Sequence, residues 1–156
     1  MVVSRITAEF DQCIEEVWGV VTSIENYEWR SDLDNVDVID SRNFIEYTRG
    51  GYATYFTKTA FIPYERWEFD MENSNMNGHW IGVFSEENNH TCIEFTEQVT
   101  VRKFFLKPLL EFYLRKQQRK YVSDLKEELH RVNGESSGTV LNDLVGLKEV
   151  SKNRPR

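Results

Sequence analysis

The sequence of 156 residues has only two cysteines, Cys13 and Cys92, and lacks a long hydrophobic run. The cysteines lie among apolar neighbours and are not closely spaced, so neither a disulfide framework nor a zinc knuckle is expected. The most apolar stretch, residues 104–114, includes charged residues and a proline, whereas a membrane span needs about 20 apolar residues. Residues 1–10 alternate apolar and polar residues, unlike a secretory signal. We therefore expect a cytoplasmic protein that is not inserted in a membrane.

An excess of positive charge is also missing, and the formal net charge is -7. Affinity for nucleic acid depends on Lys and Arg that displace counterions from phosphates, so nucleic acid is not an expected partner. His79, His90 and His130 are too far apart for metal-ligand spacing, and no phosphate-binding loop, dinucleotide fingerprint or nucleophile elbow is present. The sequence predicts neither a metal nor a cofactor and indicates no particular protein partner.

Large aromatic residues are abundant. Aromatic side chains make up 13% and hydrophobic side chains 40% of the sequence. This composition excludes a disordered chain, and the length is typical of one domain. The rings are more numerous than a bare scaffold requires, which indicates that some of them fill or line an internal hollow.

The periodicity of the hydrophobic residues predicts the secondary structure. A strand over residues 1–10 is followed by a short helix, which Asp11 can cap, and by a second helical turn over residues 23–27. From residue 36 to 101 apolar and polar residues alternate, and four turn-like breaks interrupt this pattern. The predicted strands cover residues 36–42, 43–49, 52–61, 65–72, 79–85 and 91–101.

A long amphipathic helix is predicted over residues 108–132, beginning at Pro108. Its apolar stripe must lie on one face of the sheet, which gives an α+β fold with a seven-stranded curved antiparallel sheet around the helix. Its basic run, residues 115–120, has acidic counterparts along the helix and is expected to form a solvated, salt-bridged face. Residues 1–132 form the predicted domain, and residues 133–156 are expected to be a flexible tail.

Three segments carry a resemblance to a known family: VWGVVTSIENYEWRSD (residues 17–32), NGHW (77–80) and TCIEFTEQVTV (91–101). With the order of the elements, they resemble the START-like superfamily of polyketide cyclases, dehydrases and lipid-transport proteins (SRPBCC), which are relatives of the birch-pollen allergen. The resemblance covers about residues 3–132. It implies a helix-grip fold with a hydrophobic small-molecule ligand between the concave sheet face and the long helix.

Alternation suggests which side chains face that space. Apolar residues share one face of each of two strands and are candidate ligand contacts, although packing of the interior is the alternative: Trp67, Phe69, Met71, Ile93 and Phe95. The resemblance places Trp29 at the mouth of the pocket. Gln117, Tyr121, Tyr47 and Tyr55 could add contacts or polar anchors, but the register of residues 43–61 is undetermined.

Glu97 continues the alternation of Ile93 and Phe95 and is the candidate acid or base. The alternative is that the strand end turns it to water. Three functions stay open: binding or transport of a lipid-like or polycyclic molecule, a cyclase or dehydratase, and an interaction module with a filled interior. A shared fold does not choose among them.

Overall fold

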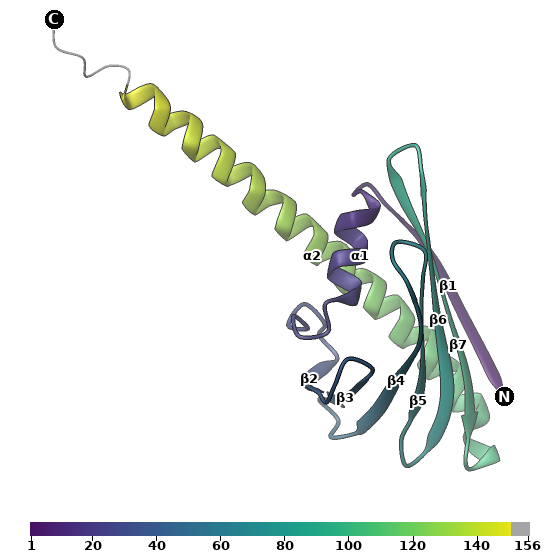
Figure 1. The fold of residues 1–156 in the computed structure, drawn as a ribbon. Coiled ribbons are helices and arrows are strands. Elements are labelled where there is room, and N and C mark those ends of the chain that lie inside the picture. Colours follow the sequence, from purple (N-terminus) through teal and green to yellow (C-terminus); the bar gives the residue numbers. More distant parts are fainter. Residues whose placement is uncertain (151–156) are drawn as a thin grey trace, which may run out of the picture.

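Seven antiparallel strands form one curved sheet in the computed structural model, which describes residues 1–150 and the side chains of residues 1–135 (Figure 1). The sheet order is β1-β7-β6-β5-β4-β3-β2. The strands are β1 (Val2–Phe10), β2 (Leu33–Val38), β3 (Asn43–Thr48), β4 (Ala53–Ile62), β5 (Arg66–Glu72), β6 (Met76–Glu87) and β7 (His90–Val101). The predicted fold class is confirmed, because this sheet curves around the long helix α2 (Lys107–Val150).

The first helix, α1 (Ile14–Thr22), buries one apolar face, formed by Ile14, Val17, Trp18 and Val21. Asp11 does not cap it, because the helix begins after Cys13 and has no side-chain cap. The predicted second helix over residues 23–27 is wrong. This segment makes separate turns, in which Asn26 N donates to Ser23 O and Arg30 N donates to Tyr27 O. Single turns do not propagate, because a helical nucleus fixes several residues for one hydrogen bond.

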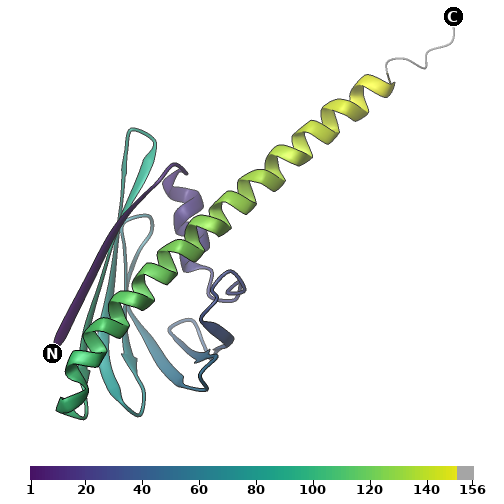
Figure 2. The ribbon, with the colours of Figure 1, turned by 180° about the vertical axis from the view of Figure 1, so that it is seen from behind.

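The long helix follows a short 3₁₀ helix, η1 (Phe104–Leu106), and does not end at Val132. It continues through Asn133 and Gly134 to Val150, and Figure 2 shows its later turns extending beyond the sheet. Glycine costs a helix only about 1 kcal/mol, which neighbouring turns can offset. Arg131 also spans this point, with a 2.6 Å ion pair to Glu135. The flexible tail remains a prediction, and its side chains from residue 136 onward lie outside the described residues.

No helix in the described part of the chain is long and apolar enough to cross a membrane. Cys13 and Cys92 are free and half-buried, not fully in the core.

The helix docks on the sheet through one apolar stripe and one polar pair. Leu114, Leu125 and Leu129 are buried in the core. Between them, the buried Gln118 accepts a 2.8 Å hydrogen bond from Ser4 Oγ of β1 and donates a 3.2 Å bond to Ser4 O. These two hydrogen bonds satisfy the buried amide of Gln118 and the buried hydroxyl of Ser4, and they fix α2 against the edge strand β1.

A glycine in β6 makes room for the indole of Trp80 on the concave face. Trp80, Gly82 and Phe84 share this face, and a Cβ at Gly82 would lie 2.6 Å from Cζ3 of Trp80. The indole therefore lies over the position where another residue would carry a side chain. It stacks on Phe69 at a centroid distance of 4.7 Å. The missing side chain thus shapes the wall of the interior.

Candidate functional site

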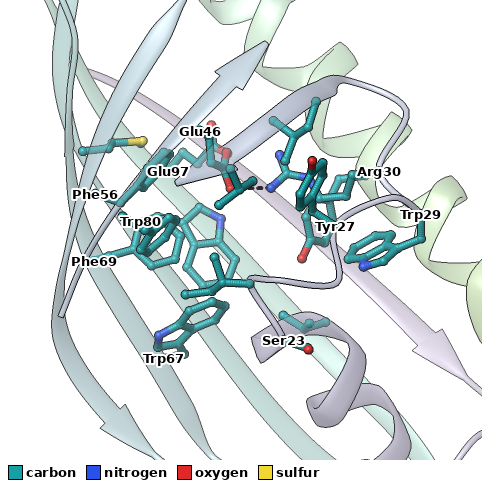
Figure 3. Close-up of a pocket in the computed structure, with 17 residues that line it drawn as sticks. Ser23, Tyr27, Trp29, Arg30, Glu46, Phe56, Trp67, Phe69, Trp80 and Glu97 are labelled. Carbon is teal, nitrogen blue, oxygen red and sulfur yellow. Dashed lines mark hydrogen bonds and ion pairs between the residues drawn. The ribbon is translucent and has the colours of Figure 1, made fainter. Parts of the chain in front are cut away.

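A cavity of about 130 Å³ lies between the concave sheet face and the segment that joins α1 to β2 (Figure 3). Strands β3 to β7 supply one wall, and residues 23–33 supply the other. Tyr121 closes it from α2. The lining residues are Val21, Ser23, Ile24, Tyr27, Trp29, Arg30, Leu33, Val36, Phe44, Glu46, Phe56, Trp67, Phe69, Met71, Trp80, Glu97 and Tyr121.

A second cavity of about 130 Å³ adjoins the first and shares Arg30, Glu97 and Tyr121 with it. It extends toward the first turns of α2, where Tyr113 and Gln117 line it. The two hollows therefore form one interior region with a common polar wall.

Stacked and tilted rings build the apolar wall of the first cavity. Phe44 and Phe56 stack at 4.8 Å, and Phe69 meets Phe56 edge-on at 5.1 Å. Trp67 and Trp80 continue the layer, since both contact Phe69 and their rings lie 6.0 Å from each other. Aromatic pairs of this geometry gain stabilisation beyond their buried area, so the wall is a packed surface and not a loose lining.

The opposite end of the cavity is polar and centred on Arg30. Its guanidinium forms ion pairs with Glu46 at 2.6 Å and with Asp32 at 2.8 Å, and it lies 5.1 Å from the ring centroid of Tyr121. Figure 3 shows the carboxyl groups of Glu46 and Glu97 side by side near this guanidinium. The side chain of Glu97 has no hydrogen bond or ion pair with any described residue.

Burial shifts the ionisation of this cluster. It raises the pKa of Glu97 to about 7, with Arg30 lowering the pKa and Glu46 raising it. Burial also raises the pKa of Glu46 against the lowering effect of Arg30. For Arg30 burial lowers the pKa, but Glu46 and Asp32 outweigh it and the net shift is upward. Near neutral pH the cavity therefore holds a fixed cation beside a carboxyl group that can either donate or accept a proton.

We expect the Glu97→Gln variant to gain stability relative to wild type as the pH rises. In the folded protein the pKa of Glu97 is about 7, against 4.5 when unperturbed. As the pH rises above the pKa of Glu97 in the unfolded chain, the free energy of unfolding of the wild type therefore falls. This loss of stability is complete once the pH exceeds the pKa in the folded protein. Because Glu97 is only half-buried, the difference should grow by about 1–3 kcal/mol between about pH 5 and pH 8, measured by urea unfolding.

Glu94→Gln is the matched control for this measurement. Glu94 lies on the same strand but faces outward, where its side chain is 43% exposed and lies 3.7 Å from Arg5. Its stability relative to wild type should change little over the same pH range. Parallel pH profiles for Glu97→Gln and Glu94→Gln would contradict the raised pKa of Glu97.

The structure brings most of the predicted site residues to the interior. The first cavity is lined by Trp29, Trp67, Phe69, Met71, Glu97 and Tyr121, and the second by Phe95 and Gln117. Ile93 is buried in the core and lines neither cavity. Glu97 faces the cavity instead of turning outward, so its alternation with Ile93 and Phe95 is unbroken.

Tyr47 and Tyr55 lie on the outer face of the sheet. Their neighbours Glu46 and Phe56 line the cavity, and the side chains of adjacent strand residues point to opposite faces. Tyr55 is 57% exposed. The expectation that these tyrosines supply phenolic groups to the interior is therefore wrong.

The sequence reasoning missed the Arg30 cluster. Arg30 follows Trp29 in a polar turn, and Glu46 lies on a strand of undetermined register. The only local signal is the pairing of Arg30 with Asp32 two residues later. Within the described residues, no group of His, Cys, Asp and Glu is arranged to hold a metal ion.

Comparison with solved structures identifies the architecture. A START superfamily protein from Mycobacterium smegmatis matches with a TM-score of 0.72 and 11% identity, over 83% of this chain and 98% of that one. The chain has a START-like fold. A conserved protein from Geobacillus kaustophilus matches this START-like fold with a TM-score of 0.73 and 12% identity, over 83% and 96% of the two chains. At such identities the likeness shows the fold alone.

A protein from the dynemicin biosynthetic locus also matches, with a TM-score of 0.68 and 12% identity. The match covers 82% of this chain and 47% of that one. No protein-family model matches the sequence. No curated protein matches it either. The START-like fold is therefore established by structure, and the function has to be argued from the cavity.

Proposed function

We propose that this START-like domain binds a small hydrophobic molecule in the cavity between the sheet and residues 23–33. The observation that carries the proposal is a hollow with a wall of aromatic rings and one polar end, where Glu97 has no partner among the described residues. A few polar groups in an otherwise apolar concavity are typical of small-molecule sites. Apolar burial would supply most of the affinity, at about 25 cal/mol per Å².

The size of the cavity limits the ligand. An apolar cavity of roughly 150 Å³ is large enough for benzene, whereas sites for drug-sized ligands have roughly 300–1,000 Å³. At about 130 Å³, the first cavity fits one ring or a short acyl chain. A lipid-like or polycyclic ligand would require the adjoining second cavity or an outward movement of the turns around Trp29.

One polar group supports a ligand that carries a hydroxyl group. Glu97, with a pKa near 7, lies at the polar end of the cavity and can donate to or accept from a ligand hydroxyl there.

Fluorine NMR titration tests the proposal with two small rings, fluorobenzene and para-fluorophenol. We expect saturable binding of both by the wild type, with para-fluorophenol bound about threefold or more tightly because its hydroxyl can meet the polar end. The variant Val36→Phe adds a ring to the cavity lining and should weaken both by about tenfold.

Val38→Phe is the matched control, because Val38 lies on the same strand, is 44% exposed and lines neither cavity. It should bind both probes like the wild type. Absence of probe binding by a folded wild type, or equal binding by Val36→Phe, would refute a ligand cavity.

A second candidate, an acid–base enzyme of the cyclase or dehydratase type, is favoured by one observation. A general acid or base works best when its pKa lies near the working pH, and the pKa of Glu97 is about 7 inside the cavity. Mass spectrometry of a bound polyketide-like compound after incubation separates the two functions. Unchanged recovery supports binding, whereas a product that Glu97→Gln fails to form supports the enzyme. The third function, an interaction module with a filled interior, is disfavoured by the two cavities.

A further inference from the structure

The first turns of α2 and the preceding η1 carry an exposed apolar cluster, here called the aromatic end (residues 104–113). Phe104 is 87% exposed, Phe112 is 72% exposed and Leu109 is 69% exposed, and Phe105 is also exposed. Single exposed apolar residues are ordinary, but several large ones on one short segment mark an interaction surface. The aromatic end lies at the end of the sheet that is far from α1 (Figures 1 and 2).

The exposed residues of the aromatic end do not lie on the side of α2 that packs on the sheet. Leu114 and, less completely, Leu110 pack into the core. Phe105, Leu109 and Phe112 follow one another at spacings of four and three residues, which puts them on a separate stripe. The segment formed by η1 and the first turns of α2 therefore has two apolar stripes, and the described residues cover only one of them.

Positive charge surrounds this second stripe. Residues 102–120 contain seven Lys and Arg residues and a single acidic residue, Glu111, a local formal charge of +6 in a chain of net charge -7. The expected salt-bridged face is largely wrong. Of the basic residues in 115–120, only Arg115 forms an ion pair with a described residue, to Glu111. Lys103 and Lys107, next to the exposed rings, also have no ion pair in the described part of the chain.

We propose that the aromatic end docks on the surface of an anionic lipid bilayer. Exposed Phe and Leu side chains can enter the boundary between headgroups and acyl chains, while the nearby lysines meet lipid phosphates and carboxylates. Each basic residue near such a surface contributes about 1 kcal/mol. A second copy of this chain fits less well, because a twofold contact through this surface would bring its cations face to face. Docking of this kind needs no membrane-spanning helix.

The position of the aromatic end connects docking with the cavity. Tyr113 is 49% exposed at the end of the cluster and also lines the second cavity with Gln117. A bilayer held against this end would face the same part of the interior. This link to ligand exchange rests on the proposed function, whereas docking itself does not.

Flotation with lipid vesicles tests docking. Wild-type protein should float with vesicles of phosphatidylcholine and phosphatidylserine, bind vesicles of phosphatidylcholine alone much more weakly, and dissociate as salt is raised. The double variant Phe104→Ser/Phe112→Ser should bind the anionic vesicles about tenfold or more weakly. Lys103→Gln/Lys107→Gln should bind them several-fold more weakly and lose part of the salt dependence.

The control is Ile39→Ser/Tyr52→Ser, which removes two other exposed apolar side chains, 59% and 57% exposed, far from α2 in the chain. It should float like the wild type. All substituted side chains are exposed, so each variant is expected to fold. Circular dichroism checks this. Failure of wild type to float with anionic vesicles, or equal flotation of Phe104→Ser/Phe112→Ser, would overturn the proposal. The proposal would also be overturned if light scattering showed that the wild type is a dimer that does not bind vesicles, and that Phe104→Ser/Phe112→Ser is a monomer. Failure of the cavity titration alone would leave docking intact.

Discussion

Replacing Arg30 with methionine should lower the free energy of unfolding by about 3–4 kcal/mol at neutral pH. The guanidinium is the only cation paired with Glu46 and Asp32 among the described residues, and its side chain is 17% exposed. Without it, carboxylates at the polar end of the cavity would repel one another in a poorly solvated place. Urea unfolding at two pH values checks this. The loss should shrink toward pH 5, because the pKa of Glu97 is about 7 and this carboxyl group is neutral there.

Arg5→Met provides the control, because Arg5 is 61% exposed and lies 3.7 Å from Glu94 on the outer face. Exposed pairs of this kind contribute about 0–1 kcal/mol. Adding Glu46→Gln to Arg30→Met should recover part of the stability. Equal losses for Arg30→Met and Arg5→Met would show that the cluster is well solvated.

Phe69→Ala should cost about 3–5 kcal/mol in the free energy of unfolding. Phe69 lines the cavity, and a ring beside a hollow loses fewer contacts than a fully packed ring. Phe69 is nevertheless only 8% exposed. Its ring contacts four other rings, those of Phe44, Phe56, Trp67 and Trp80. Chemical denaturation followed by circular dichroism measures the loss. A folded variant should also have a larger cavity and an altered affinity for para-fluorophenol.

Phe61→Ala makes the same substitution on the neighbouring strand β4. Phe61 is 51% exposed and contacts one ring, that of Trp18 at 5.3 Å, so a loss of about 1 kcal/mol is expected. If both variants lost the same amount, the ring layer would not be the stabilising wall of the cavity.

The fold could be predicted largely because the alternation in residues 65–72 and 91–101 is unbroken. Trp67, Phe69 and Phe95 are inward for this local reason. Where a turn interrupts the pattern, the register is lost, and a shift of one residue exchanges the two faces. This explains the wrong placement of Tyr47 and Tyr55 on either side of Gly50 and Gly51.

The polar end of the cavity could not be predicted, because its cause is tertiary. Arg30 is paired with Glu46 because β3 brings this residue against the turn that carries Arg30. The prediction that α2 ends at residue 132 is wrong for the opposite reason. Asn133 and Gly134 are local signals for a break, and the surrounding helix overrides them. Local pattern thus located the apolar wall, and long-range contacts supplied the charges.

The order of strands in the sheet has a consequence for folding during synthesis. Each of the strands β2 to β6 lies beside the next strand in the chain, so β2 to β7 can pair as successive hairpins. The exception is β1, whose Val2 pairs with Val99 of β7. Closing so long a loop costs more entropy than closing a hairpin, and the partner strand is made last. The first strand must therefore stay unpaired until β7 leaves the ribosome, and its bond from Ser4 to Gln118 waits for α2 as well.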